Sequence, residues 1–388
     1  MNETRKRAGT ALLTRVVTSL FLTLAVGGVA WGEIPEVAGS RLEPSAELIV
    51  DAIRLASGGE AVDNAFMGKM TLALDFDGAA ATRLKGTRAR FNVIATSGDS
   101  LSSLTGDLQV ASNIEAPEDL RVFEAWVERD LGAHASVLAG YRDFNAEFDV
   151  ATIAAGLLNS SFGVGPDVSQ VGPSVFPRSY PGVRVRVSGD SGAYALAGAW
   201  RGVPYPIADP VSGNDVEGTF SAIELGWTRE SFGRLGSPKL TAGWWRFEAS
   251  GDRIPEGDEA VGGFYALAEA EVVLGGGRRI GGFLRAGRTL DDSITVRDYV
   301  GGGMRLASIS RVRPDDEVAV GIARARLSPA SRAHLESGAE TTVELNWTIQ
   351  LTGYLAIVPD VQFVASPAAS ATARDAFLFG VRTVITWK

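Results

Sequence analysis

Charged and amide side chains recur at every second position along several stretches of the chain, with apolar neighbours between them. The candidates of this kind are Arg88, Arg90, Arg184, Arg186, Glu224, Glu344, Asn346 and Arg382. On a strand such residues share one face, where a guanidinium offers a fixed fork of donors and a carboxylate accepts hydrogen bonds. That face could bind vicinal hydroxyl groups of a solute. For each residue the alternative stays open that it pairs with a neighbour and merely keeps a watery surface polar.

The sequence offers little for catalysis. Its only histidines are His134, in a predicted turn, and His334, in a loop on the opposite side, and there is no cysteine. This leaves no Ser–His pair on one strand and no His/Cys cluster for a transition metal. The carboxylate pairs Asp291–Asp292 and Asp315–Asp316 lie in turns, where solvated acids are common and a surface Ca²⁺ stays an open alternative. We predict that the protein is not an enzyme and has no cofactor.

The elements that would position these side chains are clearest near the C-terminus. From Val343 to Leu351, apolar and polar residues alternate strictly. A period of two predicts a β-strand with one apolar and one polar face. A short turn at Thr352–Tyr354 follows, and the last alternating strand ends at Trp387. A wall with lipid on one side and water on the other is built in this way.

Similar runs recur back to Phe66, with turn residues between them. Before the three C-terminal strands, strands are expected near residues 71–76, 88–95, 104–112, 120–131, 134–142, 183–187, 192–202, 217–231, 237–249, 261–274, 279–289, 297–310 and 314–326. The total is about sixteen, an even number typical of bacterial single-chain barrels. The sequence therefore predicts an all-β fold, a transmembrane antiparallel up-and-down β-barrel over residues 66–388.

The lengths of the connections support a barrel. Short connections near 131–134, 189–192, 275–278 and 352–353 all fall on one side of the predicted wall. Most longer connections fall on the other side: 142–180, 203–217, 250–260, 327–337 and 367–373. Outer-membrane barrels have short periplasmic turns and longer outer loops, whereas a soluble sandwich has no reason to sort its loops in this way.

Composition narrows the class of protein further. The formal net charge is −9 and the pI is about 5.0, which argues against nucleic acid as a partner. Beyond the N-terminus no apolar run reaches the roughly 18 residues of a membrane-spanning helix. The absence of cysteine means that no disulfide bond stabilises the fold.

The N-terminus has the features of a secretory signal peptide. Basic residues between Arg5 and Arg15 precede an apolar run, Val16–Ala30, and the small residues Ala30 and Gly32 suit a signal peptidase. We predict a signal peptide at residues 1–32, with an uncleaved membrane anchor as the alternative.

Residues 33–65 are expected to form an N-terminal extension with a short helix. Ser45 could cap this helix, Leu48 and Ala52 share one face, and Gly58–Gly59 would end it. Such a helix would pack on the end of the barrel or act as a plug within it.

The longest connection, about 142–181, is the third outer loop of the predicted barrel and is too apolar for a free surface loop. Leu157, Leu158 and Phe162 need a packing surface, and a loop folded into the lumen would provide one and narrow the channel. Its polar residues Asn145, Glu147 and Asn159 are candidates for contact with a solute. The equally weighted alternative is that they anchor the loop to the wall by hydrogen bonds.

Several motifs resemble the OprB-type carbohydrate-selective porins. In the long connection they are Asn145–Phe148, Asn159–Gly163, Gly165–Asp167, Gly172–Ser174 and Phe176–Pro177. Near the C-terminus they are Val358–Phe363 with Pro367, Arg374–Ala376 and Gly380–Arg382. The resemblance implies an outer-membrane barrel that passes small sugars by passive diffusion through a polar lumen narrowed by a folded-in loop.

The same resemblance implies a location in the outer membrane of a Gram-negative-type bacterium. The partners it implies are outer-membrane lipid and small sugars, glucose-like mono- and oligosaccharides, and both a monomer and a homotrimer stay open. The alternatives are a general diffusion porin and a structural barrel without sugar selectivity. One stretch departs from the family: Ala365–Ala373 is rich in alanine and serine, where the family more often has glycine, asparagine and aspartate. We therefore expect different chemistry in this outer loop.

Overall fold

The computed structural model describes residues 40–78, 83–203, 217–233, 235–250, 260–292, 294–309, 312–335 and 338–387. Within them the chain forms one antiparallel sheet of 17 strands, of which β9 (Ser231–Phe232) has only two residues. The long strands are β1 (Arg41–Gly59), β2 (Asn64–Asp77), β3 (Thr87–Gly98), β4 (Asp119–Asp130), β5 (Ala135–Tyr141), β6 (Pro181–Ser188), β7 (Ala193–Gly202), β8 (Glu217–Thr228), β10 (Leu235–Ser250), β11 (Ala260–Val273), β12 (Arg279–Thr289), β13 (Val296–Ala307), β14 (Glu317–Leu327), β15 (Ala339–Thr352), β16 (Leu355–Ala365) and β17 (Arg374–Trp387).

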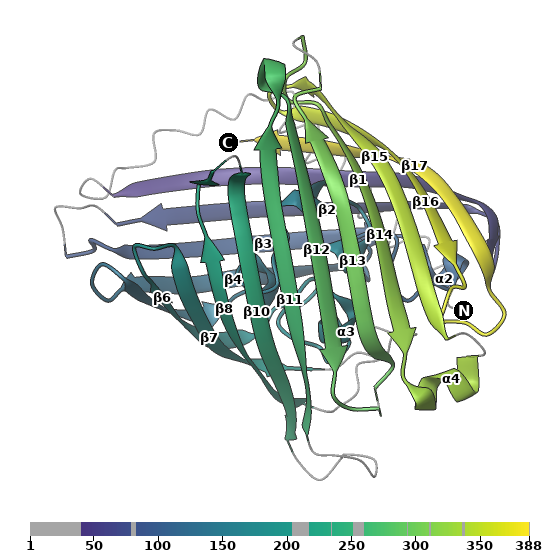
Figure 1. The fold of residues 1–388 in the computed structure, drawn as a ribbon, viewed down its shortest axis with the longest axis horizontal. Coiled ribbons are helices and arrows are strands. Elements are labelled where there is room, and N and C mark those ends of the chain that lie inside the picture. Colours follow the sequence, from purple (N-terminus) through teal and green to yellow (C-terminus); the bar gives the residue numbers. More distant parts are fainter. Residues whose placement is uncertain are drawn as a thin grey trace.

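The sheet closes on itself at its first strand. β1 pairs with β2 along one edge, where Arg41 lies opposite Asp77, and with β17 along the other, where Ala46 lies opposite Trp387. Each remaining long strand pairs with its neighbours in the chain, so the strands wrap round a common interior as tilted ribbons (Figure 1). Closure leaves no unpaired edge among the long strands, as a membrane-spanning sheet requires. The predicted antiparallel β-barrel is confirmed.

The alternation seen in the sequence sets which side chains face inward. In β15, Val343, Leu345 and Trp347 are exposed on the outer face of the sheet, whereas Glu344 and Asn346 between them are buried. The exposed residues are apolar and the buried ones polar, which is the reverse of a soluble protein and the arrangement expected in lipid. Below, "outward" and "inward" refer to these two faces.

The helix expected between Ser45 and Gly59 is wrong, because this stretch is β1. Its buried residues include Ile49, Asp51 and Ile53, while Val50 and Ala52 between them are exposed, which is a period of two. β-Branched residues fit this pleated wall better than a helix. The barrel therefore begins at Arg41, and the predicted extension over residues 33–65 is wrong over the length of β1. The predicted signal peptide, 1–32, lies outside the described residues.

The strand expected near 104–112 is also wrong. The segment contains a one-turn helix, α2 (Ser102–Thr105), followed by irregular chain. The other helices are short and lie in connections: α3 (Pro166–Ser169), α4 (Pro329–Leu335), and the 3-10 turns η1 (Phe144–Ala146), η2 (Ile153–Gly156), η3 (Ser160–Phe162) and η4 (Gly275–Gly277). None of the helices in the described part of the chain is long and apolar enough to cross a membrane.

The connections are sorted by length between the two ends of the barrel. Short links join β4 to β5, β6 to β7, β11 to β12 and β15 to β16, all at one end. The long β3–β4 loop (99–118) and β5–β6 loop (142–180) lie at the other end, together with α4 and the 366–373 connection. The β1–β2 link, 60–63, is the exception at that end. In outer-membrane barrels the end with long connections faces the cell exterior.

Candidate functional site

The β5–β6 loop is fastened to the inner wall through its own backbone. Three amide groups donate to inward carboxylates of three different strands: Asp149 to Glu224 of β8 at 2.8 Å, Ile153 to Glu269 of β11 at 2.9 Å, and Leu158 to Glu344 of β15 at 2.6 Å. All three carboxylates are buried. Hydrogen bonds from amides satisfy a carboxylate that burial would otherwise penalise. The loop therefore crosses the interior from β8 to β15.

A buried arginine fixes two further points of the loop. Arg285 of β12 donates from Nε and Nη2 to Asp149 at 2.7 Å, and from Nη1 to Asp167 at 2.8 Å. The three side chains are at most 2% exposed. The Arg285 guanidinium also lies 4.9 Å from the centre of the Tyr299 ring. Arg285 is not among the residues singled out from the sequence, although its position between the outward residues Leu284 and Ala286 marks it as inward.

Aromatic side chains wedge the first part of the loop against the wall. Phe148 stacks on Phe144 with ring centres 5.1 Å apart and meets Trp200 of β7 edge to face at 5.5 Å. Phe144 meets Phe220 of β8 at 5.1 Å. All four rings are at most 2% exposed. Phe148 thus packs as part of the wall, which leaves it no face for a solute.

The middle of the loop packs on a wall of small residues. Leu157 and Phe162 belong to a buried cluster with Phe283 of β12 and Ala323 of β14. A Cβ atom placed on Gly321 of β14 would lie 2.6 Å from the Phe162 ring and 2.8 Å from Leu157. The glycine therefore makes the space that the loop occupies. This is the packing surface that the apolar residues of the loop were expected to need.

The β3–β4 loop also turns inward and joins the β5–β6 loop. The amides of Leu108 and Gln109 donate to Glu340 of β15 at 2.7 and 2.8 Å. The two loops exchange backbone hydrogen bonds, from Asn113 to Leu158 at 2.7 Å and from Ser160 to Val110 at 2.9 Å. They form one body inside the barrel, and this explains why residues 104–112 do not form a strand of the wall.

On strands β2 to β6 the inner wall carries a chain of alternating charges. Its contacts are Arg90 with Asp75 at 2.7 Å and Glu124 at 3.0 Å, Arg142 with Glu124 at 2.7 Å and Glu147 at 3.4 Å, Arg184 with Glu147 at 2.7 Å and Glu128 at 2.8 Å, and Arg88 with Glu128 at 3.1 Å and Asp130 at 2.7 Å. We call these residues the ion-pair chain. Exposure of the side chain rises from 3% at Arg184 to 27% at Arg90 and 43% at Arg88. The chain therefore opens to solvent near Arg88 and Arg90.

A polar cavity of about 220 Å³ lies beside this open part of the ion-pair chain. Residues that line it include Glu43, Asp75, Asp77, Arg88 and Trp126. The Nε1–H group of Trp126 is buried and has no hydrogen-bond partner within the described part of the chain. The carboxylates and the guanidinium together offer acceptors and donors to a solute rich in hydroxyl groups.

The structure divides the residues singled out from the sequence into two sets. Arg88, Arg90, Glu147 and Arg184 belong to the ion-pair chain, and Arg186 stacks over the Tyr194 ring at 5.0 Å. The others make structural contacts. Glu224 and Glu344 accept loop amides, and Asn346 donates to the Gly156 carbonyl of the loop, whereas Arg382 pairs with Asp51 of the wall. Asn145 donates to the Phe148 and Asp149 carbonyls and Asn159 accepts from the Ser161 amide, all within the loop. The side chains of Asn145 and Asn159 hold the loop in shape rather than fasten it to the wall, and only the backbone amide of Asn159 reaches the wall, at Glu344.

One carboxylate of each pair considered as a surface Ca²⁺ ligand forms an ion pair in the structure. Asp292 pairs with Arg297 at 3.0 Å, and Asp316 pairs with Arg313 at 2.7 Å. These contacts hold the turns before β13 and β14. Arginine therefore supplies the positive charge at these two turns.

Known proteins resemble this chain in both sequence and fold. The family model described as "Carbohydrate-selective porin, OprB family" matches residues 63–387. The high-pH structure of Pseudomonas putida OprB superposes with a TM-score of 0.78 and 16% identity, covering 89% of this chain and 94% of that chain. The low-pH structure of the same protein has a TM-score of 0.58 and 14% identity, covering 89% and 92%.

More distant porins share the architecture. A mutant of the Rh. blastica porin superposes with a TM-score of 0.52 and 12% identity, covering 89% of this chain and all of that chain. No curated protein sequence matches this chain. At these identities the solved structures establish the fold, whereas the sequence match identifies the family.

Proposed function

We propose that this chain, which belongs to the OprB family of carbohydrate-selective porins, conducts small carbohydrates across the outer membrane by passive diffusion. The family and the closed barrel make the protein an outer-membrane channel rather than an enzyme. On its way through the barrel, a solute passes beside the ion-pair chain of β2 to β6. The two inward loops, β3–β4 and β5–β6, occupy the opposite part of the interior.

The polar cavity at Arg88 and Trp126 is the observation that carries this proposal. Arg88 is 43% exposed and Asp75 is 39% exposed, so both can exchange water for hydroxyl groups at little cost. Each charge already has a partner in the ion-pair chain. A passing sugar therefore finds donors and acceptors held in place, and does not have to neutralise an isolated charge.

The β5–β6 loop supports selectivity because it carries part of the same chain of charges. Glu147 lies on this loop and pairs with Arg184 at 2.7 Å, so the loop and the wall share one polar surface. The loop is fixed by buried contacts at Asp149, Ile153 and Leu158. A fixed loop gives the passage a constant width, which favours solutes of one size class such as glucose-like mono- and oligosaccharides.

Two further parts of the proposal concern the mature protein. We expect residues 1–32 to be removed as a signal peptide during export, which mass determination of the purified protein would test. We also propose that the protein works as a monomer or a homotrimer, since each barrel encloses a complete passage. Outer-membrane lipid is the partner of the exposed apolar face described above.

Liposome swelling tests the proposal directly. Proteoliposomes should swell faster in glucose than in an amino acid of similar size. Equal rates for the two solutes would contradict sugar selectivity and make the protein a general diffusion porin. Absence of swelling in both would contradict transport and make it a structural barrel. Empty liposomes and liposomes with heat-denatured protein are the controls.

A further inference from the structure

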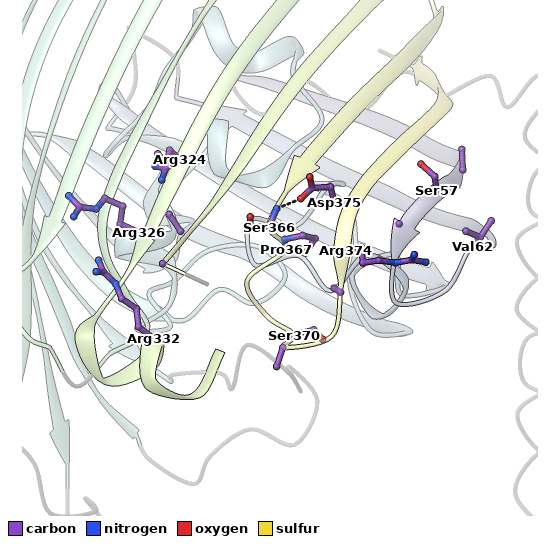
Figure 2. A pocket seen from close by; sticks show the side chains of 16 residues that line it. Ser57, Val62, Arg324, Arg326, Arg332, Ser366, Pro367, Ser370, Arg374 and Asp375 are labelled. Atoms are coloured by element: carbon purple, nitrogen blue, oxygen red, sulfur yellow. Dashed lines mark hydrogen bonds between the residues drawn. The ribbon is translucent and has the colours of Figure 1, made fainter. Parts of the chain in front are cut away.

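A basic groove lies on the outer surface of the barrel, away from the ion-pair chain. It has a volume of about 1150 Å³, and the described residues that line it include four arginines, Arg324, Arg326, Arg332 and Arg374, and one acidic residue, Asp375. Figure 2 shows Arg324, Arg326 and Arg332 together on one side of the groove and Arg374 on the other. Most of the remaining lining is alanine, serine and glycine. This local excess of positive charge contrasts with the net charge of −9 of the whole chain.

The alternation of β14 places the groove on the face that meets lipid. Val320 and Ile322 are 41% and 55% exposed, and Arg324 and Arg326 continue the same face, while Ala323 and Ala325 between them are buried. Two residues of a strand advance about 7 Å, so the two arginines follow directly after the apolar band. The groove therefore begins where the hydrocarbon region ends.

The end of the barrel at which the groove lies indicates which leaflet of the membrane it meets. The groove is lined by residues of α4 and of the 366–373 connection, which belong to the end with long connections. In outer-membrane barrels this end faces the exterior, so the groove lies at the level of the outer-leaflet headgroups. The alanine- and serine-rich stretch Ala365–Ala373 supplies small side chains that leave the groove open.

The arginines are held but keep donors for a ligand. Arg324 donates from Nη1 to Thr341 at 2.9 Å, and Arg332 donates from Nε to the Leu327 carbonyl at 3.0 Å. Arg326 lies 3.7 Å from Asp298, and its side chain is 56% exposed. These contacts use one nitrogen of each guanidinium, and guanidinium is the side-chain group best suited to bidentate binding of phosphate.

We propose that this groove binds the phosphorylated headgroup of a saccharolipid of the outer leaflet. The arginines take the phosphate groups, the shallow floor of small residues takes the sugar, and the apolar outward face of β14 and β15 takes the acyl chains. Charge complementarity and continuity with the apolar band both favour a lipid over a soluble anion, which would gain nothing from the adjoining apolar face. The inference is independent of the proposed transport function.

Native mass spectrometry in detergent tests it with diphosphoryl lipid A as the probe. The double variant R324Q/R326Q should bind the probe about thirtyfold more weakly, since each arginine near an anionic lipid surface contributes about 1 kcal/mol and two are removed. The matched control is R201Q/R246Q. Arg201 and Arg246 are also 48% and 46% exposed, but each pairs with a glutamate and neither lines the groove. The control should bind like the unmodified protein.

A second measurement uses the unmodified protein, so it does not depend on the folding of a variant. Diphosphoryl lipid A should bind more tightly than its dephosphorylated form, and the difference should shrink at high salt. Equal affinity for the two lipids would overturn the proposal. An equal loss of affinity for diphosphoryl lipid A in R324Q/R326Q and R201Q/R246Q would also overturn it. If R324Q/R326Q changed the oligomeric state but not lipid binding, the groove would be an interface between protein copies, and the proposal would be wrong.

Discussion

The guanidinium of Arg285 in β12 holds the carboxylate of Asp149 in the β5–β6 loop through two parallel hydrogen bonds of 2.7 Å. Both side chains are almost fully buried, and 136 residues separate them in the sequence. Asp167, in the same loop, accepts from Nη1 of the same guanidinium at 2.8 Å. One wall residue thus joins two distant points of the loop, and removal of its charge leaves two buried carboxylates without compensation.

R285M should therefore release the β5–β6 loop from the wall. Breaking a buried ion pair from one side costs about 3–5 kcal/mol, because the partner charge stays buried and unpaired. We expect a larger and noisier single-channel conductance, and protease cleavage within residues 142–180. R246Q, which alters an exposed arginine of β10 paired with Glu248, is the control and should leave both readouts unchanged. Unchanged conductance and protection in R285M would show that the amide contacts hold the loop without Arg285.

G321A should destabilise the packed loop through steric conflict. The new Cβ would lie 2.6 Å from the Phe162 ring, well inside van der Waals contact. Overpacking of this kind costs about 1–3 kcal/mol, which should lower the unfolding temperature in detergent. G282A is the control, because the nearest atom to its Cβ would be 3.7 Å away.

A double-mutant cycle tests the cause of that effect. In an F162A background, G321A should cost less than in the unmodified protein, because the Phe162 ring is absent and only Leu157, at 2.8 Å, still meets the new Cβ. Equal costs in the two backgrounds would mean that Phe162 is not the group that requires glycine at position 321.

R88Q should weaken the interaction of a sugar with the channel. Arg88 is the most exposed arginine of the ion-pair chain and lines the polar cavity. Loss of a charge-assisted donor to a partly solvated sugar costs about 1 kcal/mol, or about a fivefold loss in apparent affinity. The measurement is the reduction of single-channel current by glucose or maltose. R201Q, on the outer surface, should not alter it, and equal sugar block in R88Q would remove Arg88 from the proposed route.

The β3–β4 loop should become more stable as the pH falls. Burial, assisted by the nearby charge of Asp107, raises the pKa of Glu115 to about 7. The folded loop then binds more protons than the unfolded loop between about pH 4.5 and pH 7, so its stability decreases as the pH rises through this window. Hydrogen exchange of residues 99–118, corrected for intrinsic rates, should show stronger protection at pH 5.5 than at pH 8. E115Q should flatten this dependence, and protection that rises with pH would refute the assignment.

The barrel could be predicted from the sequence because its signal is local and repeated. The alternation in β15 is complete over nine positions from Val343 to Leu351, and the same period recurs in the strands before it. The sorting of connection lengths added an independent argument. Both signals come from one physical cause, a wall that meets lipid on one face and water on the other.

β1 could not be recognised in this way, because its sequence satisfies two periods. Leu48 and Ala52 fit one face of a helix, and Ile49 and Ile53 fit one face of a strand. The choice is made by pairing with β2 and β17, and β17 lies at the far end of the chain. A local pattern carries no information about partners that distant.

Only part of the site could be predicted from the sequence, and the reason is similar. The residue types of the inner wall follow from alternation, so Arg88 and Arg184 were found. Which inward residues meet the loop depends on contacts across the interior, such as Glu344 with Leu158, 186 positions away. Glu224 and Glu344 were therefore expected to face the solute, whereas they bind the loop backbone.

The wall carboxylates Glu224, Glu269 and Glu344 bind the β5–β6 loop through its peptide amides and not through its side chains. Every amino acid except proline carries that group, so a substitution at Ile153 or Leu158 changes the packing of the loop but keeps its fastening point. The attachment and the chemistry of the passage can thus be altered separately. Loop side chains other than Asp149 and Asp167, which bind Arg285, could therefore be changed to alter which solute the pore admits while the attachment of the loop stays the same.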